Sequence, residues 1–259
     1  MEGAFFDLDK TLLPGSSLFP LAREMYRQRI FRLRDIARMA ADQVAFRVLG
    51  NEAEDRMNRA RDASLQAIEG RLRHEVMAAG RVVVKEDIIP RLYPQAVELI
   101  GRHTRAGREV YICSSSPEDL LLLLADELGA DGVIGTRAEV RGDRYTGRLD
   151  GDLCHGPEKA RRVVELAAVR GIDLARSFAY SDSVNDLPLL ELVGTPVAMN
   201  PDRPLRAMAR ARGWEMLDFR VARRRTLVAS AAGAGAAAAG ALGYAAGFLV
   251  GRRSRAAGV

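Results

Sequence analysis

The chain has 259 residues, of which 48% are hydrophobic and 28% are charged, and its formal net charge is +5 at pH 7. This composition describes a folded protein and excludes an intrinsically disordered one, and its two cysteines are too few for a disulfide framework or a zinc cluster. Seven arginines and no acidic residue follow Asp218, which leaves about −2 for the rest of the chain, so the basic excess belongs to the tail and nucleic-acid binding is not predicted.

The predicted elements begin with a buried strand and continue with a long helical stretch. Residues 4–6 form an apolar run that predicts a strand, and residues 16–88 combine apolar and charged positions with helical spacing. From residue 90 onward, helical patterns alternate with short apolar runs, which is typical of a parallel sheet covered by helices on both faces. The helical patterns cover residues 90–104, 117–128, 157–170 and 185–193, and the strands are predicted at 109–113, 132–136, 177–180 and 196–199.

This order of elements predicts an α/β fold with a Rossmann-like parallel sheet. Residues 138–151 alternate around two glycines and predict a β-hairpin within it. The expected domains are a core of residues 1–15 and 89–219, an inserted helical cap of residues 16–88, and a C-terminal tail of residues 220–259 that contains a hydrophobic helix.

Polar side chains follow three of the predicted strands. Asp7 and Asp9 come after the first strand, Ser114 follows the run at 109–113, and Asp182 and Asp186 follow the run at 177–180. Ligands of open parallel sheets bind just beyond the carboxyl ends of the strands. We therefore expect these side chains to converge on one site.

Four short motifs contain these residues, in the order "FFDLDKT", "VYICSSSP", "HGPEKA" with Lys159, and "AYSDSVNDLPLL". Together they resemble the four motifs of the haloacid dehalogenase (HAD) superfamily, and specifically of subfamily IB, its phosphoserine-phosphatase-like branch. The resemblance covers residues 4–219 and implies a helical cap inserted after the first motif.

The resemblance implies a role for each of the polar residues. Asp7 would attack phosphorus and form an aspartyl-phosphate, while Asp9 would protonate the leaving oxygen and later take a proton from the attacking water. Ser114 and Lys159 would complete the catalytic set by stabilising charge on the phosphoryl oxygens. Phosphate binding would involve Thr11, Ser115 and Asn185, and a Mg²⁺ cofactor would be held by oxygens of Asp7, Asp9, Asp182 and Asp186.

The predicted function is a Mg²⁺-dependent phosphomonoester hydrolase that acts on a small or lipid-linked phosphate ester. Asp9 argues against dehalogenase chemistry, because such a reaction has no leaving oxygen to protonate. Three alternatives remain: a phosphoserine phosphatase, a non-catalytic phosphate-binding regulatory or scaffold protein of the same fold, and an enzyme that transfers the phosphoryl group to an acceptor other than water. Ser16 stands where the resemblance implies a glutamate for the substrate ammonium, and Ser115 and Ser116 stand where it implies two glycines, so phosphoserine is expected to be a poor substrate.

The three histidines show no ligand spacing. His74, His103 and His155 are far apart in the sequence and the proposed chemistry needs none of them. Each is predicted to be a surface histidine or one whose hydrogen bonds are satisfied.

The C-terminal tail contains an uncharged run of 25 residues, 226–250, with arginines at both ends. About 20 apolar residues cross a bilayer core, but alanine and glycine contribute little to insertion, so a low-complexity tail or a partner-bound helix remains an alternative. Because no signal peptide is expected at the N-terminus, we predict a single-pass C-terminal anchor in the cell membrane with a cytoplasmic catalytic domain, the alternative being a cytoplasmic protein. The expected partners are a phosphate ester, membrane lipid and, since Gly243, Gly247 and Gly251 recur every four residues, a second copy in a homodimer.

Overall fold

The structure is a computed structural model that describes residues 1–31, 62 and 64–220. The chain divides into two compact units, Met1–Leu217 and Asp218–Val259, and the second unit is described only as far as residue 220. The predicted membrane-spanning run, 226–250, lies outside the described residues. Within the described ranges, no helix is both long enough and apolar enough to cross a membrane.

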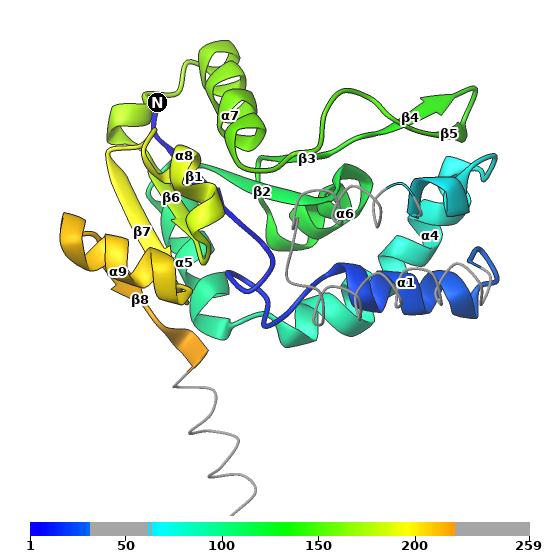
Figure 1. Cartoon of the computed structure of the whole chain (residues 1–259), viewed down its shortest axis with the longest axis horizontal. Helices are drawn as coiled ribbons and strands as arrows, with labels where there is room; N and C mark the ends of the chain where they lie inside the picture. The colour runs from blue at the N-terminus through cyan, green and yellow to red at the C-terminus, as the bar shows by residue number, and fades with distance from the viewer. Residues whose placement is uncertain (32–61, 63, 221–259) are drawn as a thin grey trace, which may run out of the picture. The chain divides into compact units, whose positions relative to one another are not determined.

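The first unit is built on a parallel sheet of six strands, which confirms the predicted α/β fold. The strand order is β3-β2-β1-β6-β7-β8, and every neighbouring pair is parallel. An antiparallel hairpin, β4–β5, follows β3 as the sequence predicts (Figure 1). The strands are β1 (Gly3–Phe6), β2 (Glu109–Pro117), β3 (Gly132–Thr136), β4 (Ala138–Arg141), β5 (Arg144–Leu149), β6 (Phe178–Ser181), β7 (Thr195–Met199) and β8 (Glu215–Leu217).

The helices of the described residues agree with the predicted runs, except near the end of the core. The predicted helix at 185–193 is instead a 3-10 turn followed by a four-residue helix, because Pro188 starts a new helix and the chain must turn at Gly194 into β7. The sequence patterns did not predict α9 and β8. The helices are α1 (Leu18–Arg27), α4 (Arg73–Val83), α5 (Pro94–Arg105), α6 (Glu118–Leu128), α7 (Pro157–Arg170), α8 (Leu187–Leu190) and α9 (Arg203–Arg212), with π-helix η1 (Val84–Ile88) and 3-10 turns η2 (Ile89–Arg91), η3 (Leu174–Arg176) and η4 (Val184–Asp186).

The central strand β1 is buried on both faces, which explains its unbroken apolar sequence. Phe5 faces a core cluster that includes Val163 of α7 and Leu205 of α9. Phe6 faces the opposite way, where its ring stacks on Tyr180 and contacts His103 of α5. Helices α5 and α7 accordingly cover opposite faces of the sheet (Figure 1).

A second, smaller apolar cluster lies between α1 and α4, in the region predicted to be the cap. It contains Met25, Ile30, Phe31 and Ala79, separate from the cluster around Phe5. The chain just before α4 also pairs with the hairpin through an antiparallel bridge between Leu72 and Arg144. Residues 32–61 lie outside the described residues, so the cap bounds 16–88 stay a prediction.

His103 is a core histidine, and the predicted hydrogen-bond satisfaction holds for one of its ring nitrogens but not for the other. Its Nε2 lies 2.7 Å from the Tyr180 hydroxyl, while its Nδ1 is buried and has no hydrogen-bond partner. Burial, assisted by the positive charges of Arg108 and Arg102, lowers the pKa of His103 to about 4. The folded protein therefore holds this imidazole in its neutral form.

We predict that His103 makes the fold sensitive to acid. Since the pKa is near 6.5 when unfolded and about 4 when folded, the unfolded chain binds more protons between these values. The stability contributed by neutral His103 is complete above pH 6.5 and is lost as the pH falls toward 4, by up to ~3 kcal/mol. Urea unfolding at pH 7, 6 and 5 should show a smaller pH dependence for His103→Gln than for the wild type. Equal pH dependence would contradict the assignment.

Candidate active site

The predicted site residues other than Lys159 lie at or after the carboxyl ends of β1, β2 and β6. Asp7 follows β1 directly, and its backbone amide donates to the Tyr180 carbonyl of β6 at 2.9 Å. Ser114 was predicted to follow a strand ending at residue 113, but β2 continues to Pro117 with a shift in its pairing to β3. The Thr136 hydroxyl supports this extension because it donates to the Ser115 carbonyl at 2.7 Å.

Lys159 joins the first and fourth motifs through a buried ion-pair network. Its Nζ lies 2.9 Å from Oδ1 of Asp7 and 2.8 Å from Oδ1 of Asp186, and the lysine is only 2% exposed. Burial alone would lower the pKa of Lys159, but the charges of the two carboxylates outweigh it and raise the pKa. Burial also raises the pKa of Asp7, against the lowering effect of Lys159. Lys159 therefore supplies a permanent positive charge beside Asp7.

The local backbone explains how Lys159 reaches β1. Lys159 lies in the first turn of α7, which begins with Pro157 after Gly156. Gly156 has a φ of +51°, a region that favours glycine. This turn carries the start of α7, and with it the lysine, back toward the sheet.

The loop after β1 is braced around Asp7. The Thr11 hydroxyl donates to Asp7 Oδ2 at 3.0 Å, so both carboxylate oxygens of Asp7 have partners. Lys10 has a φ of +63°, which is unfavourable for a residue with a side chain. The Asn200 side-chain amide donates to the carbonyls of Lys10 and Thr11 and stabilises this loop. The sequence analysis predicted Thr11 as a site residue but missed Asn200.

Asp9 is held by two serines that directly precede α1. The Ser17 amide donates to Asp9 Oδ1 at 2.9 Å, and the Ser16 hydroxyl donates to Oδ2 at 3.1 Å. Ser16 is exposed, whereas Ser17 is fully buried. The residue that stands in place of the expected glutamate is thus bound to Asp9 itself.

Ser114 belongs to a group of hydroxyls that the sequence analysis only partly anticipated. Its Oγ lies 3.2 Å from Ser116 Oγ, and Ser116 Oγ lies 2.8 Å from Ser17 Oγ. Ser116, which stands where the resemblance implies a glycine, is buried and contacts both Ser114 and Ser17. Ser115, half-buried, points its carbonyl at Thr136.

The fourth motif places its residues in different environments. The Ser181 hydroxyl donates to Asp186 Oδ2 at 2.7 Å, which fixes Asp186 beside Lys159. Asn185 is exposed in η4, and its backbone amide donates to the Ser183 hydroxyl at 3.2 Å. Asp182 is 6% exposed, and burial raises the pKa of its carboxyl to about 6 despite the charge of Lys10.

The chemistry of these donors fits a hard divalent cation. Among the described residues, the Asp182 carboxylate has no hydrogen-bond or ion-pair partner although it is largely buried, and such a group is stabilised by a cation. No three histidine, cysteine or acidic side chains within the described ranges are grouped closely enough to hold a metal by themselves. The Asp182 carboxylate is therefore the described oxygen group whose burial such an ion would offset.

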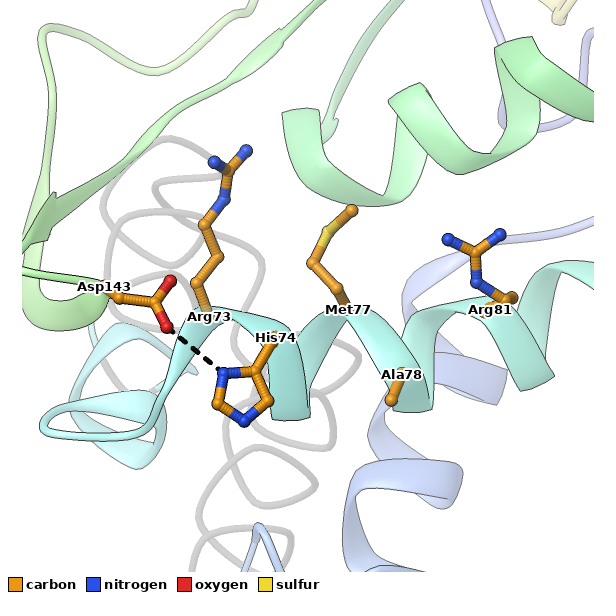
Figure 2. A pocket seen from close by; sticks show the side chains of 6 residues that line it. All are labelled: Arg73, His74, Met77, Ala78, Arg81 and Asp143. Carbon is orange, nitrogen blue, oxygen red and sulfur yellow. Dashed lines mark hydrogen bonds and ion pairs between the residues drawn. The ribbon is translucent and has the colours of Figure 1, made fainter.

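A cavity of about 440 Å³ lies elsewhere, between α4 and the turn of the β4–β5 hairpin. Figure 2 shows His74 of α4 facing Asp143 of the hairpin, with His74 Nδ1 and Asp143 Oδ2 3.1 Å apart. The cavity is lined by Arg73, His74, Met77, Ala78, Arg81 and Asp143. None of these is a predicted site residue, so this cavity is separate from the carboxylate cluster.

Comparison with known proteins identifies the family. Residues 4–191 match the haloacid dehalogenase-like hydrolase family. The chain belongs to this family. It is 41% identical to the phosphoserine phosphatase SerB1 of Mycobacterium tuberculosis over 252 residues, which cover 97% of this chain and 80% of that protein. These matches identify it as a phosphatase of the phosphoserine-phosphatase-like branch.

Solved structures share the fold of this chain. A Bordetella pertussis protein of unknown function is 33% identical, with a TM-score of 0.74 over 84% of this chain and 98% of that one. The apo form of a phosphoserine phosphatase has a TM-score of 0.58 at 17% identity, over 85% of this chain and 94% of that one. At that identity the second likeness supports the HAD fold alone.

We predict that Lys159→Met strongly destabilises the protein. The substitution leaves the two buried carboxylates of Asp7 and Asp186 without their cation, and loss of one partner from a buried ion pair typically costs about 3 to 5 kcal/mol. The free energy of unfolding should be measured in urea without added divalent cations. Arg161→Met is the matched control, because Arg161 lies on the same helix and its ion pairs are exposed. Equal losses for the two variants would contradict the prediction.

Proposed function

We propose that this HAD phosphatase is a Mg²⁺-dependent phosphomonoester hydrolase that acts through an aspartyl-phosphate on Asp7. The observation that supports this most is the placement of Lys159, whose ammonium is shared between Asp7 and Asp186 at the end of the central strand. A lysine in this position serves as a fixed charge beside a nucleophile and not as a surface residue. Ser114 lies in β2 and Asp9 lies in the loop after β1, and these two strands are parallel neighbours in the sheet.

In the first step, a carboxylate oxygen of Asp7 forms a bond to phosphorus while the bond from phosphorus to the ester oxygen breaks. Asp9 donates a proton to the departing oxygen, and its hydrogen bonds from Ser16 and Ser17 hold it in place for this role. Lys159 and the Ser114 hydroxyl stabilise charge on the phosphoryl oxygens. In the second step, water attacks the aspartyl-phosphate, Asp9 accepts a proton, and Asp7 is released with inorganic phosphate.

The cofactor would be held by Asp7, Asp182 and the main-chain carbonyl of Asp9, with Asp186 next to them. When bound, Mg²⁺ would supply the positive charge that lets one anion approach another. Asp186 is committed to Lys159 and Ser181, so its contribution is to position the lysine. Thr11 orients Asp7, while Ser115 and Asn185 stay proposed phosphate contacts.

The nature of the ester is a separate proposal. The relative named a phosphoserine phosphatase supports phosphoserine as one candidate. In this chain, however, Ser16 supplies no negative charge for a substrate ammonium and its hydroxyl is bonded to Asp9. We therefore propose that the substrate is a small or lipid-linked phosphate ester other than phosphoserine.

We predict that Asp7→Asn lowers the rate of ester hydrolysis by at least ~10³-fold, because it removes the nucleophile with little change in shape. Asp9→Asn should still bind phosphate but should stall protonation of the leaving oxygen. Release of inorganic phosphate from several esters, with and without Mg²⁺, measures both effects. Asp173→Asn is a suitable control, since Asp173 caps η3 away from the predicted site residues. Substantial activity of Asp7→Asn would exclude the covalent mechanism.

Phosphoserine should be a poor substrate of the wild-type enzyme. An ammonium group loses solvation in a closed site and needs an anionic contact, which Ser16 does not provide. Steady-state kinetics with phosphoserine and with uncharged aryl and alkyl phosphates provide the comparison. A kcat/KM for phosphoserine of ~10⁴ M⁻¹s⁻¹ or higher would instead assign the protein as a phosphoserine phosphatase.

A further inference from the structure

Three buried serine hydroxyls form a continuous series of hydrogen bonds, and the proposed mechanism uses only one of them, that of Ser114. Ser17 Oγ lies 2.8 Å from Ser116 Oγ, which lies 3.2 Å from Ser114 Oγ. Each of the three serines is at most 1% exposed. Burial of a hydroxyl costs free energy unless the hydroxyl is hydrogen-bonded. The hydrogen bonds among the three serines therefore compensate for their burial.

The side chain of Ser17 is bonded in an unusual way for a serine at the start of a helix. A serine at the N-cap usually accepts a hydrogen bond from an amide of the first helical turn. Ser17 is the N-cap of α1, yet it has helical φ and ψ and its side chain makes no capping bond. Its hydroxyl contacts Ser116 of β2 instead, 99 positions away in the sequence.

The series of three serine hydroxyls connects two parts of the candidate site, Asp9 and Ser114. At one end, the Ser17 amide donates to Asp9 Oδ1 at 2.9 Å. At the other end, Ser114 Oγ accepts from the Ser116 amide at 3.2 Å and is the predicted contact to the phosphoryl group. Ser116 is thus the one described side chain whose hydroxyl lies within hydrogen-bond distance of both Ser17 Oγ and Ser114 Oγ.

We propose that Ser116, held by Ser17, is a positioning residue that directs the Ser114 hydroxyl toward the phosphoryl group. The inference rests on the proposed function of the same site. Each hydroxyl has one proton to donate and can accept two hydrogen bonds. When Ser17 donates to Ser116 and Ser116 donates to Ser114, the acceptor positions of Ser114 are filled and its own proton points outward.

Without a ligand, the same chain can run in the opposite direction, with Ser114 donating to Ser116. Arrival of a phosphoryl oxygen then reverses the three protons by rotation of the hydroxyls, and no proton is transferred between residues. Hydrogen bonds in such a chain polarise one another, so each strengthens the next. The proposal accounts for serine at position 116, because neither glycine nor alanine there could relay this orientation.

The test is a double-mutant cycle with Ser17→Ala, Ser116→Ala and the double variant. We expect each single variant to weaken the affinity for inorganic phosphate about fivefold, the effect of one net hydrogen bond, and the double variant to bind no worse than Ser116→Ala. Titration calorimetry with inorganic phosphate in the presence of Mg²⁺ gives the affinities. In steady-state kinetics with para-nitrophenyl phosphate, kcat/KM should fall by the same factor. This fall should come from a higher KM and not from a lower kcat.

Ser177→Ala is the matched control. Ser177 is also a fully buried serine with two hydrogen bonds, but it lies at the amino end of β6, where it contacts Gly3 and Asp173. This variant should lose stability without a change in phosphate affinity. If Ser116→Ala fails to fold, Ser17→Ala tests the same relay from its other end.

The outcomes separate this proposal from the proposed function. Wild-type affinity in Ser17→Ala and Ser116→Ala, or losses that simply multiply in the double variant, would overturn the relay even if the enzyme hydrolyses esters. The expected affinity pattern in a protein that hydrolyses no ester would support the relay and refute the hydrolase. A wild-type protein that does not bind phosphate would overturn both.

Discussion

The fold at the carboxyl edge of the sheet depends on one buried ammonium group. Lys159 neutralises Asp7 and Asp186, which come from the ends of β1 and the segment after β6, while the lysine itself comes from α7. Two carboxylates could not be buried together without it, because each would be repelled by the other and deprived of water. The same three groups that close this edge of the core are therefore the ones that the proposed chemistry uses.

The charge balance of the site explains why a cation is part of the proposed mechanism. Asp7, Asp9, Asp182 and Asp186 are acidic, and Lys10 and Lys159 are the lysines that act on them electrostatically. Lys159 is already shared by two carboxylates, so its single charge does not by itself balance a phosphate dianion as well. A further positive charge beside Asp182 would lower the cost of bringing the substrate to Asp7.

The sequence predicted the sheet and the positions of the polar residues better than it predicted their partners. Asp7 and Asp186 were expected at the same edge of the sheet because each follows a short apolar run, and Lys159 was added through the resemblance. The structure brings these three side chains into contact. The Asn200 brace, the Ser17–Ser116 contact and the extension of β2 depend on residues about 20 to 190 positions apart. Short-range patterns contain no information on such pairings. The missed strand β8 has the same cause, since its three residues are too few for a periodic signal.

Ser16 and Ser17 show how the start of α1 connects the cap region to the chemistry. Both residues bind Asp9, and Ser17 also contacts the end of β2, so the first residues of this segment fix the proposed acid and base before any substrate is present. Preorganised groups of this kind do not have to be reoriented during the reaction. The cost is that Ser16 and Ser17 are no longer available to recognise a leaving group. Selectivity for the ester must therefore come from residues other than these two serines.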